Sequence, residues 1–294
     1  MMRVENRLAA VGFHSGELAV QEQAGVSGQA GRLSAMVGRG QLRSGTADFL
    51  GSARLAVLTA HDPDGTVWSS PLFGEPGFLS AVDSGTLHID GSLPEADPLS
   101  DMPGGQLAGV IVIDFATRRR WRINGVVTTS PDGGTDLEVD QSYGNCPKYI
   151  TIRTIDTPTG SLGPQRDPVF AGDSLRAEDR RLIQRADTFF LGTTHPTSGA
   201  DTSHRGGPAG FVTAVHDRLW FPDYAGNNLF NSLGNIAVDP SAALLFIDFD
   251  TGTTLQLSGT AALTWDDSAP ADEVHTGRGV SFTPERVVVS GAGR

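Results

Sequence analysis

The chain has 294 residues and a formal net charge of −12 at pH 7, with 38% hydrophobic and 19% charged residues. This charge argues against general nucleic-acid binding, and the absence of a run of about 18 apolar residues argues against a membrane span. Its single cysteine, Cys146, excludes an internal disulfide, and no apolar secretion signal opens the sequence, so we expect a cytoplasmic protein. The length allows two cores of roughly 110 to 130 residues each.

Residues 1–50 are predicted to form a helical segment. Apolar residues are spaced along it as on helix faces, with glycines as breaks; they are Leu18, Val20, Leu33, Met36 and Val37. The pattern changes to strands at Leu55–Thr59, a short apolar run that ends in the turn signal Asp62-Pro63-Asp64-Gly65.

The remainder predicts about six short strands in each half of the chain. In the first half they are Leu55–Thr59, Thr66–Pro71, Phe78–Val82, Gly85–Asp90, Leu107–Phe115 and Arg118–Thr129. In the second half they include Phe189–Thr193, Phe211–Val215, Leu219–Pro222, Ala242–Phe249 and Thr254–Thr264. Turns every 8 to 12 residues indicate small antiparallel barrels. We expect barrels at 51–154 and 181–294, joined by a linker and helix at 155–180.

Two segments 134 residues apart are nearly the same. Ile113–Thr117 matches Ile247–Thr251, and Ser69 falls on Ser203 at the same spacing. Gly77-Phe78 falls on Gly210-Phe211 at a spacing one residue shorter. We interpret the chain as a tandem duplication, in which each copy serves as a control for the other.

The copies differ most after their fourth strand. The second copy has Gly226-Asn227-Asn228 ahead of an amphipathic helix that ends at Asp239-Pro240, and such a helix start suits a phosphate. The alternative is that Asn227 only caps the helix. The first copy has three acids and three prolines at 91–103, which would repel an anion, so we expect that copy to have lost the site.

A second difference lies at 202–208. Ser203 and Arg205 share one face of a strand, and Arg205 is the expected phosphate contact, unless it pairs with Asp223 instead. Gly206 and Gly207 would let a planar ring approach the backbone. His204 is either a hydrogen-bond donor to a ligand or a structural histidine.

The basic block Arg118-Arg119-Arg120-Trp121-Arg122 stands out in an acidic chain. Trp121 is expected to face the core, with Arg118, Arg120 and Arg122 on the opposite face. These arginines have three interpretations: a solvated surface, salt bridges between barrels, or an anion site. Tyr143, Lys148 and Tyr149 are most simply packing and surface groups.

Taken together, these residues resemble the pyridoxamine 5′-phosphate oxidase-like FMN-binding split barrels, and more narrowly their duplicated bacterial members. The resemblance rests on Ser203–Pro208, Phe221–Tyr224, Asn227-Asn228, Asn231–Asn235, Phe13–Gln21 and Gln141–Ile150. It implies a mainly β fold of two six-stranded split barrels with short helices, paired as a pseudo-dimer with FMN in the groove between them.

The resemblance also implies which residues hold the cofactor. They are Ser203, His204, Arg205, Gly206, Gly207, Asp223, Tyr224, Asn227, Asn228 and Asn231, with Arg120 and Arg122 from the first copy. We expect a flavin-dependent oxidoreductase with a small-molecule substrate or electron donor; the alternatives are a non-catalytic flavin or haem module and a deazaflavin-dependent reductase. No metal-ligand set is evident. A further homodimer of whole chains is left open.

Overall fold

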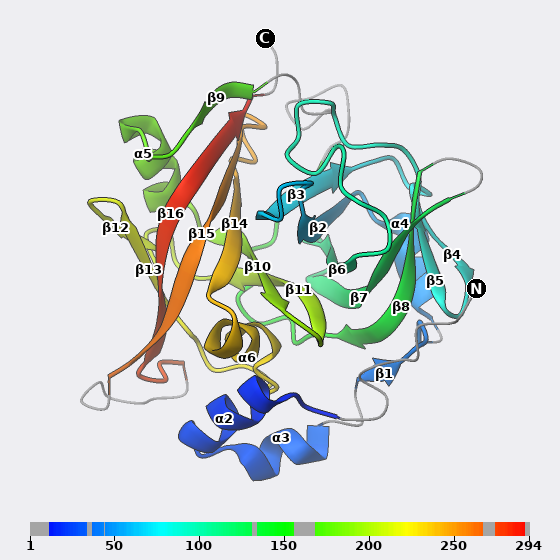
Figure 1. The fold of residues 1–294 in the computed structure, drawn as a ribbon, viewed down its shortest axis with the longest axis horizontal. Helices are drawn as coiled ribbons and strands as arrows, with labels where there is room; N and C mark the ends of the chain where they lie inside the picture. Colours follow the sequence, from blue (N-terminus) through cyan, green and yellow to red (C-terminus); the bar gives the residue numbers. More distant parts are fainter. Residues whose placement is uncertain are drawn as a thin grey trace.

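The computed structural model describes residues 12–33, 37–43, 45–130, 134–155, 168–266 and 274–291. Two antiparallel sheets, one from each half of the sequence, lie side by side (Figure 1). The first contains β2 (Leu55–His61), β3 (Val67–Phe73), β4 (Leu79–Asp83), β5 (Thr86–Ile89), β6 (Leu107–Asp114), β7 (Arg119–Thr129) and β8 (Thr135–Gly144). The second contains β10 (Thr188–His195), β11 (Gly199–Gly206), β12 (Thr213–Val215), β13 (Arg218–Pro222), β14 (Ser241–Ile247), β15 (Thr254–Trp265) and β16 (Arg278–Ser290).

The two sheets have the same topology, strand for strand. Their orders are β3-β2-β6-β7-β8-β5-β4 and β11-β10-β14-β15-β16-β13-β12. The pairing register also shifts at the same place in each sheet, between Asn124 and Gly125 of β7 and between Ser258 and Gly259 of β15. The predicted duplication is therefore present in the fold as two split barrels. One predicted pairing was wrong: Leu58 pairs with Ser70 as Leu191 pairs with Ser203, so Ser70, not Ser69, corresponds to Ser203.

Each sheet has eight strands, two more than the six predicted: one long strand and one short strand. The long strands not predicted are β8 and β16, which pair with β7 and β15. In β8, buried Leu137 and Val139 alternate with the more exposed Asp136 and Glu138, so the period-two pattern was present in the sequence.

Short elements extend the two sheets at their edges. The first sheet is joined by β1 (Gly38–Arg39) and the second by β9 (Pro168–Gly172), which lies in the predicted linker. Helices α2 (Ser15–Gln23), α3 (Ser27–Leu33) and α4 (Thr46–Ser52) precede the first barrel, and α5 (Ala177–Arg185) precedes the second. Met36 of the predicted helical segment, and linker residues 156–167, lie outside the described residues.

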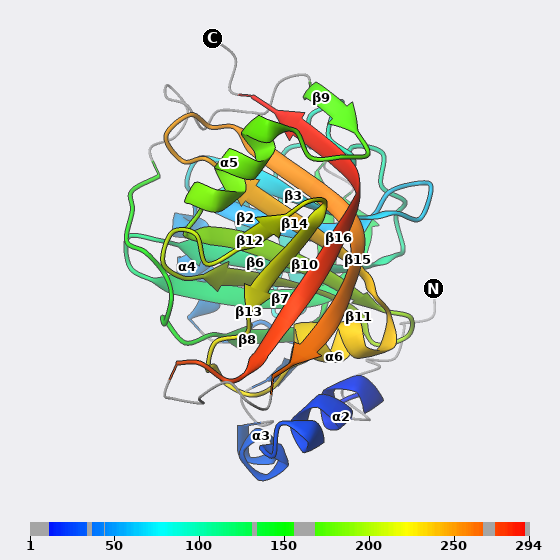
Figure 2. The ribbon, with the colours of Figure 1, turned by 90° about the vertical axis from the view of Figure 1, so that its left-hand side faces the viewer.

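The unbroken apolar runs of the central strands arise because these strands are buried on both faces. In β2, Ala56 and Leu58 face the core of the first barrel, whereas Leu55 and Val57 face a core shared by both barrels. The second barrel contributes Phe190, Leu245 and Ile247 to this shared core. The barrels thus pair within one chain, and Figure 2 shows strands of the first sheet behind β14, β15 and β16 of the second.

A close backbone contact also joins the barrels. The Thr202 hydroxyl donates to the carbonyl of Gly109 at 2.7 Å and also lies 2.7 Å from the Thr59 hydroxyl. A Cβ on Gly109 would lie 2.8 Å from the Cα of Asp201, so β6 and β11 approach closely only because residue 109 has no side chain.

Helix α2 packs on α6 (Asn231–Val238), below the barrels in Figure 1. A Cβ on Gly16 would lie within 2.9 Å of the Gly234 backbone, so the helices touch through glycines. Beside them, His14 and Glu17 are buried. Burial, aided by His195, lowers the pKa of His14 to about 4, and burial raises the pKa of Glu17 to about 8. Neither group is charged near pH 7, so their 3.6 Å contact is not an ion pair.

The raised pKa of Glu17 predicts a loss of stability in mild base. A carboxyl with a folded-state pKa above its unfolded value contributes stability that is complete below pH 4.5 and lost as the pH rises through about 8. We expect the free energy of unfolding to fall by about 2 kcal/mol from pH 6.5 to pH 8. Urea unfolding at several pH values measures this. The Glu17→Gln variant should lose most of this dependence; the same slope in both proteins would contradict the assignment.

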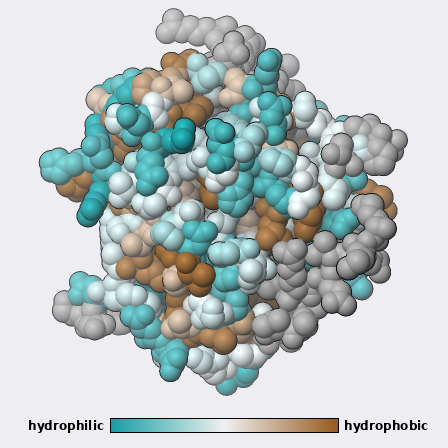
Figure 3. Space-filling view, viewed as in Figure 1, coloured by the Kyte–Doolittle hydropathy of each residue, from teal (hydrophilic) through white to brown (hydrophobic). Residues whose placement is uncertain are grey.

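The face shown in Figure 3 carries its hydrophobic residues in separate patches among polar ones. Within the described ranges, no helix combines the length and the hydropathy that crossing a bilayer requires.

Candidate functional site

A cleft opens where the first barrel meets the second. The first barrel contributes the start of β7 and residues 143–149, and the second contributes the end of β11 and residues 222–233. Its interior volume is about 100 Å³, and about 870 Å³ when the space open to solvent is included. The deep part therefore has room for a group of phosphate size, and a larger ligand would extend into the open part.

Arg120 is the cation at the centre of this cleft. Its guanidinium donates to His204 Nδ1 at 2.7 Å, to the His204 carbonyl at 3.2 Å and to the Cys146 carbonyl at 2.9 Å, while its buried Nε has no partner. Among the described residues, no carboxylate lies within ion-pair distance of it. Burial lowers the pKa of Arg120 to about 9, helped by the charges of Arg122 and Arg205, so it stays charged at pH 7.

His204 accepts this contact as a neutral imidazole. Burial, together with Arg120 beside it, lowers the pKa of His204 well below its ordinary value. Its Nε2 is buried without a partner, and the rings of Phe115 and Phe190 lie edge-on at 5.9 and 5.8 Å. His204 was predicted to be either a hydrogen-bond donor to a ligand or a structural histidine, and these contacts are those of a structural histidine.

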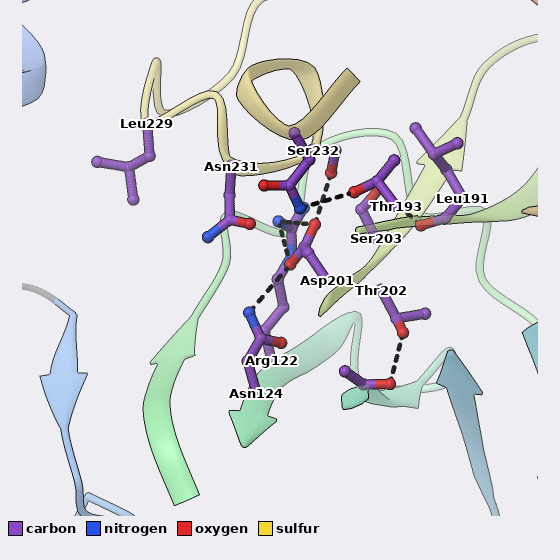
Figure 4. Close-up of polar contacts among 12 residues, drawn as sticks. Arg122, Asn124, Leu191, Thr193, Asp201, Thr202, Ser203, Leu229, Asn231 and Ser232 are labelled. Atoms are coloured by element: carbon purple, nitrogen blue, oxygen red, sulfur yellow. Dashed lines mark hydrogen bonds and ion pairs between the residues drawn. The ribbon is translucent and has the colours of Figure 1, made fainter. Parts of the chain in front are cut away.

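Arg122 forms a buried salt bridge between the barrels. Its Nη1 lies 3.1 and 3.0 Å from the two carboxylate oxygens of Asp201, which is fully buried on β11. Asp201 also accepts from Asn124 and, at 2.6 Å, from the Ser232 hydroxyl on α6, as Figure 4 shows. Burial alone would lower the pKa of Arg122, but Asp201 raises it. One carboxylate thus joins both barrels and the first turn of α6.

Arg205 is also paired. Its Nη1 donates to Asp223 at 3.0 Å and its Nε to the Ser203 hydroxyl at 3.2 Å. Asp223 lies 3.0 Å from Arg278 as well, so one carboxylate serves two arginines. Burial lowers the pKa of Arg205, and the nearby carboxylate of Asp223 offsets part of this decrease. The alternative given for Arg205, pairing with Asp223, is what the structure contains.

The amide-rich loop ends in the first turn of α6, but the helix starts later than predicted. It begins at Asn231, with Phe230 as the preceding residue in a left-handed conformation, so Asn227 does not cap it. Asn227 instead accepts from the Leu229 N–H at 3.2 Å, and Asn228 donates to Gln29 at 3.0 Å. Asn231, Ser232 and Leu233 line the cleft, and first-turn N–H groups have no partner inside a helix.

Two tyrosines stack at the cleft. The rings of Tyr149 and Tyr224 lie 5.2 Å apart, and Tyr149 donates to the Ala225 carbonyl at 3.0 Å. A Cβ on Gly206 would lie 1.9 Å from the Tyr149 carbonyl oxygen. The backbone of Tyr149, and not the planar ring of a ligand, therefore lies against Gly206. At Gly207 the added atom would meet the ring of Phe211.

Most of the residues predicted from the sequence surround this one cleft. Those that line it are Arg120, Arg122, His204, Arg205, Gly206, Asp223, Tyr224, Asn227, Asn228 and Asn231. Ser203 and Gly207 do not; Ser203 supports Arg205 from behind, since it is fully buried. Of the interpretations given for the basic block, a solvated surface is wrong for Arg120 and Arg122, because both reach across to the second barrel.

The sequence reasoning missed several cleft residues. Tyr143, Lys148 and Tyr149 line it rather than only packing or covering the surface. Asp201, which holds Arg122 behind the cleft, was not predicted either. The resemblance already included Gln141–Ile150, so the signal for the tyrosines and the lysine was present. Asp201 had no such signal, because its role depends on a partner 79 residues away.

Comparisons with known proteins agree with this picture in the second half of the chain. Residues 175–285 match the family model of pyridoxamine 5′-phosphate oxidase. No curated protein sequence matches the chain.

Among solved structures, a candidate pyridoxamine 5′-phosphate oxidase from Lactobacillus delbrueckii is similar at 16% identity and a TM-score of 0.32, over 41% of this chain and 97% of that one. HutZ, the haem storage protein from Vibrio cholerae, is similar at 13% identity and a TM-score of 0.31, over 41% and 97%. An F420 reductase is similar at 17% identity and a TM-score of 0.27, over 38% and 91%.

The matched residues begin just before α5 and extend into β16, so they span most of the second sheet with the loop and helix that form the cleft. The first sheet repeats this topology in full. Residues 175–285, which form most of the second barrel, therefore match the pyridoxamine 5′-phosphate oxidase family.

Proposed function

We propose that the cleft between the barrels binds FMN and that the protein is a flavin-dependent oxidoreductase acting on a small molecule. The observation that carries this proposal is Arg120, a mostly buried guanidinium for which the described residues provide no carboxylate. A buried cation is costly unless an anion accompanies it, and a ligand phosphate would supply that anion.

The charges around the cleft support an anionic ligand. Five cationic side chains line it or touch its lining: Arg120, Arg122, Lys148, Arg205 and Arg278. Two carboxylates, Asp201 and Asp223, are paired with three of them. The cationic side chains around the cleft thus outnumber the carboxylates by three, although the protein as a whole has a net charge of −12. Arg120 and Lys148 are the cations left for a ligand.

The donor set suits the phosphate end of FMN. Arg120 and Lys148 would supply charge, and the first-turn N–H groups of α6 would supply neutral donors. Three further polar atoms of the cleft are buried without a partner, and a ligand could engage them; they are Arg120 Nε, Arg122 Nε and Asn145 Oδ1. The interior has no room for the ring system, which would lie in the open part beside Tyr149 and Tyr224.

A bound flavin would supply the electron transfer, and the chain's own residues would bind and orient it. Haem receives less support from this cleft, because His204 is held by Arg120 and flanked by two phenylalanines, so no open face is available for iron. A deazaflavin would use similar donors, and the visible spectrum of the bound cofactor distinguishes it from FMN.

We expect one FMN per chain. The corresponding place beside the first copy has Thr254 at the position of Arg120, and Pro71 and Leu72 at the positions of His204 and Arg205, so it offers no comparable cation. Titration of the full chain with FMN, followed by flavin absorbance and fluorescence, measures the ratio. A ratio near two would contradict the difference between the copies, and no binding would contradict the proposal itself.

A further inference from the structure

The first barrel has a larger cavity at the place that corresponds to the cleft of the second. It lies between the loop of residues 90–102 and the ends of β3 and β5, with an interior volume of about 590 Å³. This is within the usual range for small-molecule sites. Apolar side chains form much of its lining: Leu58, Leu72, Phe73, Phe78, Leu93, Leu99 and Met102.

The strand register shows how the two sites correspond. Ala56 pairs with Leu72 as Phe189 pairs with Arg205, so Leu72 occupies the position of Arg205. By the same ladder, Pro71 occupies the position of His204. The first-barrel cavity therefore has two apolar residues at the positions where the second-barrel cleft has His204 and Arg205.

The inter-barrel arginine is replaced as well. Gln256 stands on β15 where Arg122 stands on β7, because Ile247 pairs with Thr254 as Ile113 pairs with Arg120. The Gln256 amide donates to the Ser70 hydroxyl at 3.0 Å and to Asp97 at 3.2 Å. Asp97 is buried, which raises its pKa, and it also accepts from Ser70. These polar groups bond to one another through the Gln256 amide nitrogen, and none of them lines the cavity.

The ionisable residues that do line the cavity are both acidic. Asp90 and Glu95 are exposed at its edge, and its described lining contains no lysine, arginine or histidine. An anion such as a flavin phosphate would be repelled, whereas a cation would be attracted. We propose that this cavity binds a small apolar molecule that carries one positive charge, such as an arylalkyl amine.

Two probes of the same shape and opposite charge test this: 3-phenylpropylamine and 3-phenylpropionate, each titrated into the full chain. Met102 lines the cavity and is one of only four methionines, so ¹³C-methyl methionine NMR reports on it directly. The Met102→Leu variant assigns its signal. We expect the amine to shift this signal in a saturable manner and the carboxylate to bind at least fivefold more weakly.

Two variants complete the test. Leu93→Trp places a large side chain into the cavity from the loop and should abolish the shift, with the unchanged Met signals showing that the protein is folded. The Asp90→Asn, Glu95→Gln variant should weaken amine binding about two- to fivefold, since exposed charge pairs contribute up to about 1 kcal/mol. Equal binding of the two probes, or amine binding that survives Leu93→Trp, would overturn the proposal. Both results are independent of whether FMN binds the other site.

Discussion

Replacing Asp201 by asparagine is expected to lower the free energy of unfolding by about 3–5 kcal/mol. The substitution removes the charge that compensates Arg122, whose side chain is only 13% exposed, and Asp201 itself is fully buried. It also weakens the contact that Ser232 of α6 makes with the same carboxylate. An unpaired buried charge costs far more than the ion pair contributes. Chemical denaturation of both proteins measures the difference.

Asp217→Asn is the matched control. Asp217 pairs with Arg180 at 2.7 Å, but their side chains are 66% and 33% exposed, so this substitution should cost less than about 1 kcal/mol. Replacing both inter-barrel partners, as Arg122→Met with Asp201→Leu, should recover much of the loss, because no buried charge is then left alone. If Asp201→Asn costs no more than Asp217→Asn, the network does not hold the barrels together.

The second large effect is expected on cofactor affinity. Arg120→Met should weaken FMN binding roughly 10- to 150-fold, because a charge-assisted contact to phosphate contributes about 1.5–3 kcal/mol. Methionine keeps an unbranched side chain in the cleft and removes the charge. Equilibrium titration followed by flavin fluorescence gives both dissociation constants.

Arg119→Met is the control from the same strand. Arg119 is exposed and lies over the ring of Phe49, 4.8 Å from its centre, on the other side of β7 from the cleft. This variant loses the same charge from the protein as a whole, so it should bind FMN as the unaltered chain does. Equal losses for the two variants would mean that overall charge, and not a contact by Arg120, sets the affinity.

The duplication and much of the strand order could be predicted because they follow from local patterns. The apolar runs at β2, β6, β10 and β14 mark strands buried on both faces, and the repeat fixes which strands correspond. The start of α6 was predicted too early, because Asn227 and Phe230 adopt local turns that the helical spacing of Leu229 and Leu233 does not reveal.

The partners of the site residues could not be predicted in the same way. That Asp201 holds Arg122, and that the Tyr149 backbone covers Gly206, depends on contacts between segments far apart in the chain. The pairing of Arg205 with Asp223 was foreseen only as an alternative, since the sequence places both residues near the loop without fixing their geometry. Because Asp223 already pairs with Arg205, we now propose Arg120 and not Arg205 as the arginine that contacts the phosphate.

The two copies show how one fold accommodates two different sites. The same position of the long strand holds Arg122 in one copy and Gln256 in the other, and each side chain reaches the opposite barrel. With the arginine, the cleft beside it remains polar and positively charged. With the glutamine, the neighbouring polar groups bond to one another and an apolar cavity is left.

The most direct test of a phosphate-binding flavin site compares FMN with riboflavin, which has the same ring system and no phosphate. Both are titrated into the unaltered full chain, and the two dissociation constants are compared. Because the deep cleft and Arg120 would engage the phosphate, we predict that FMN binds at least about tenfold more tightly, a difference of about 1.4 kcal/mol. Equal affinities for the two flavins would contradict the account.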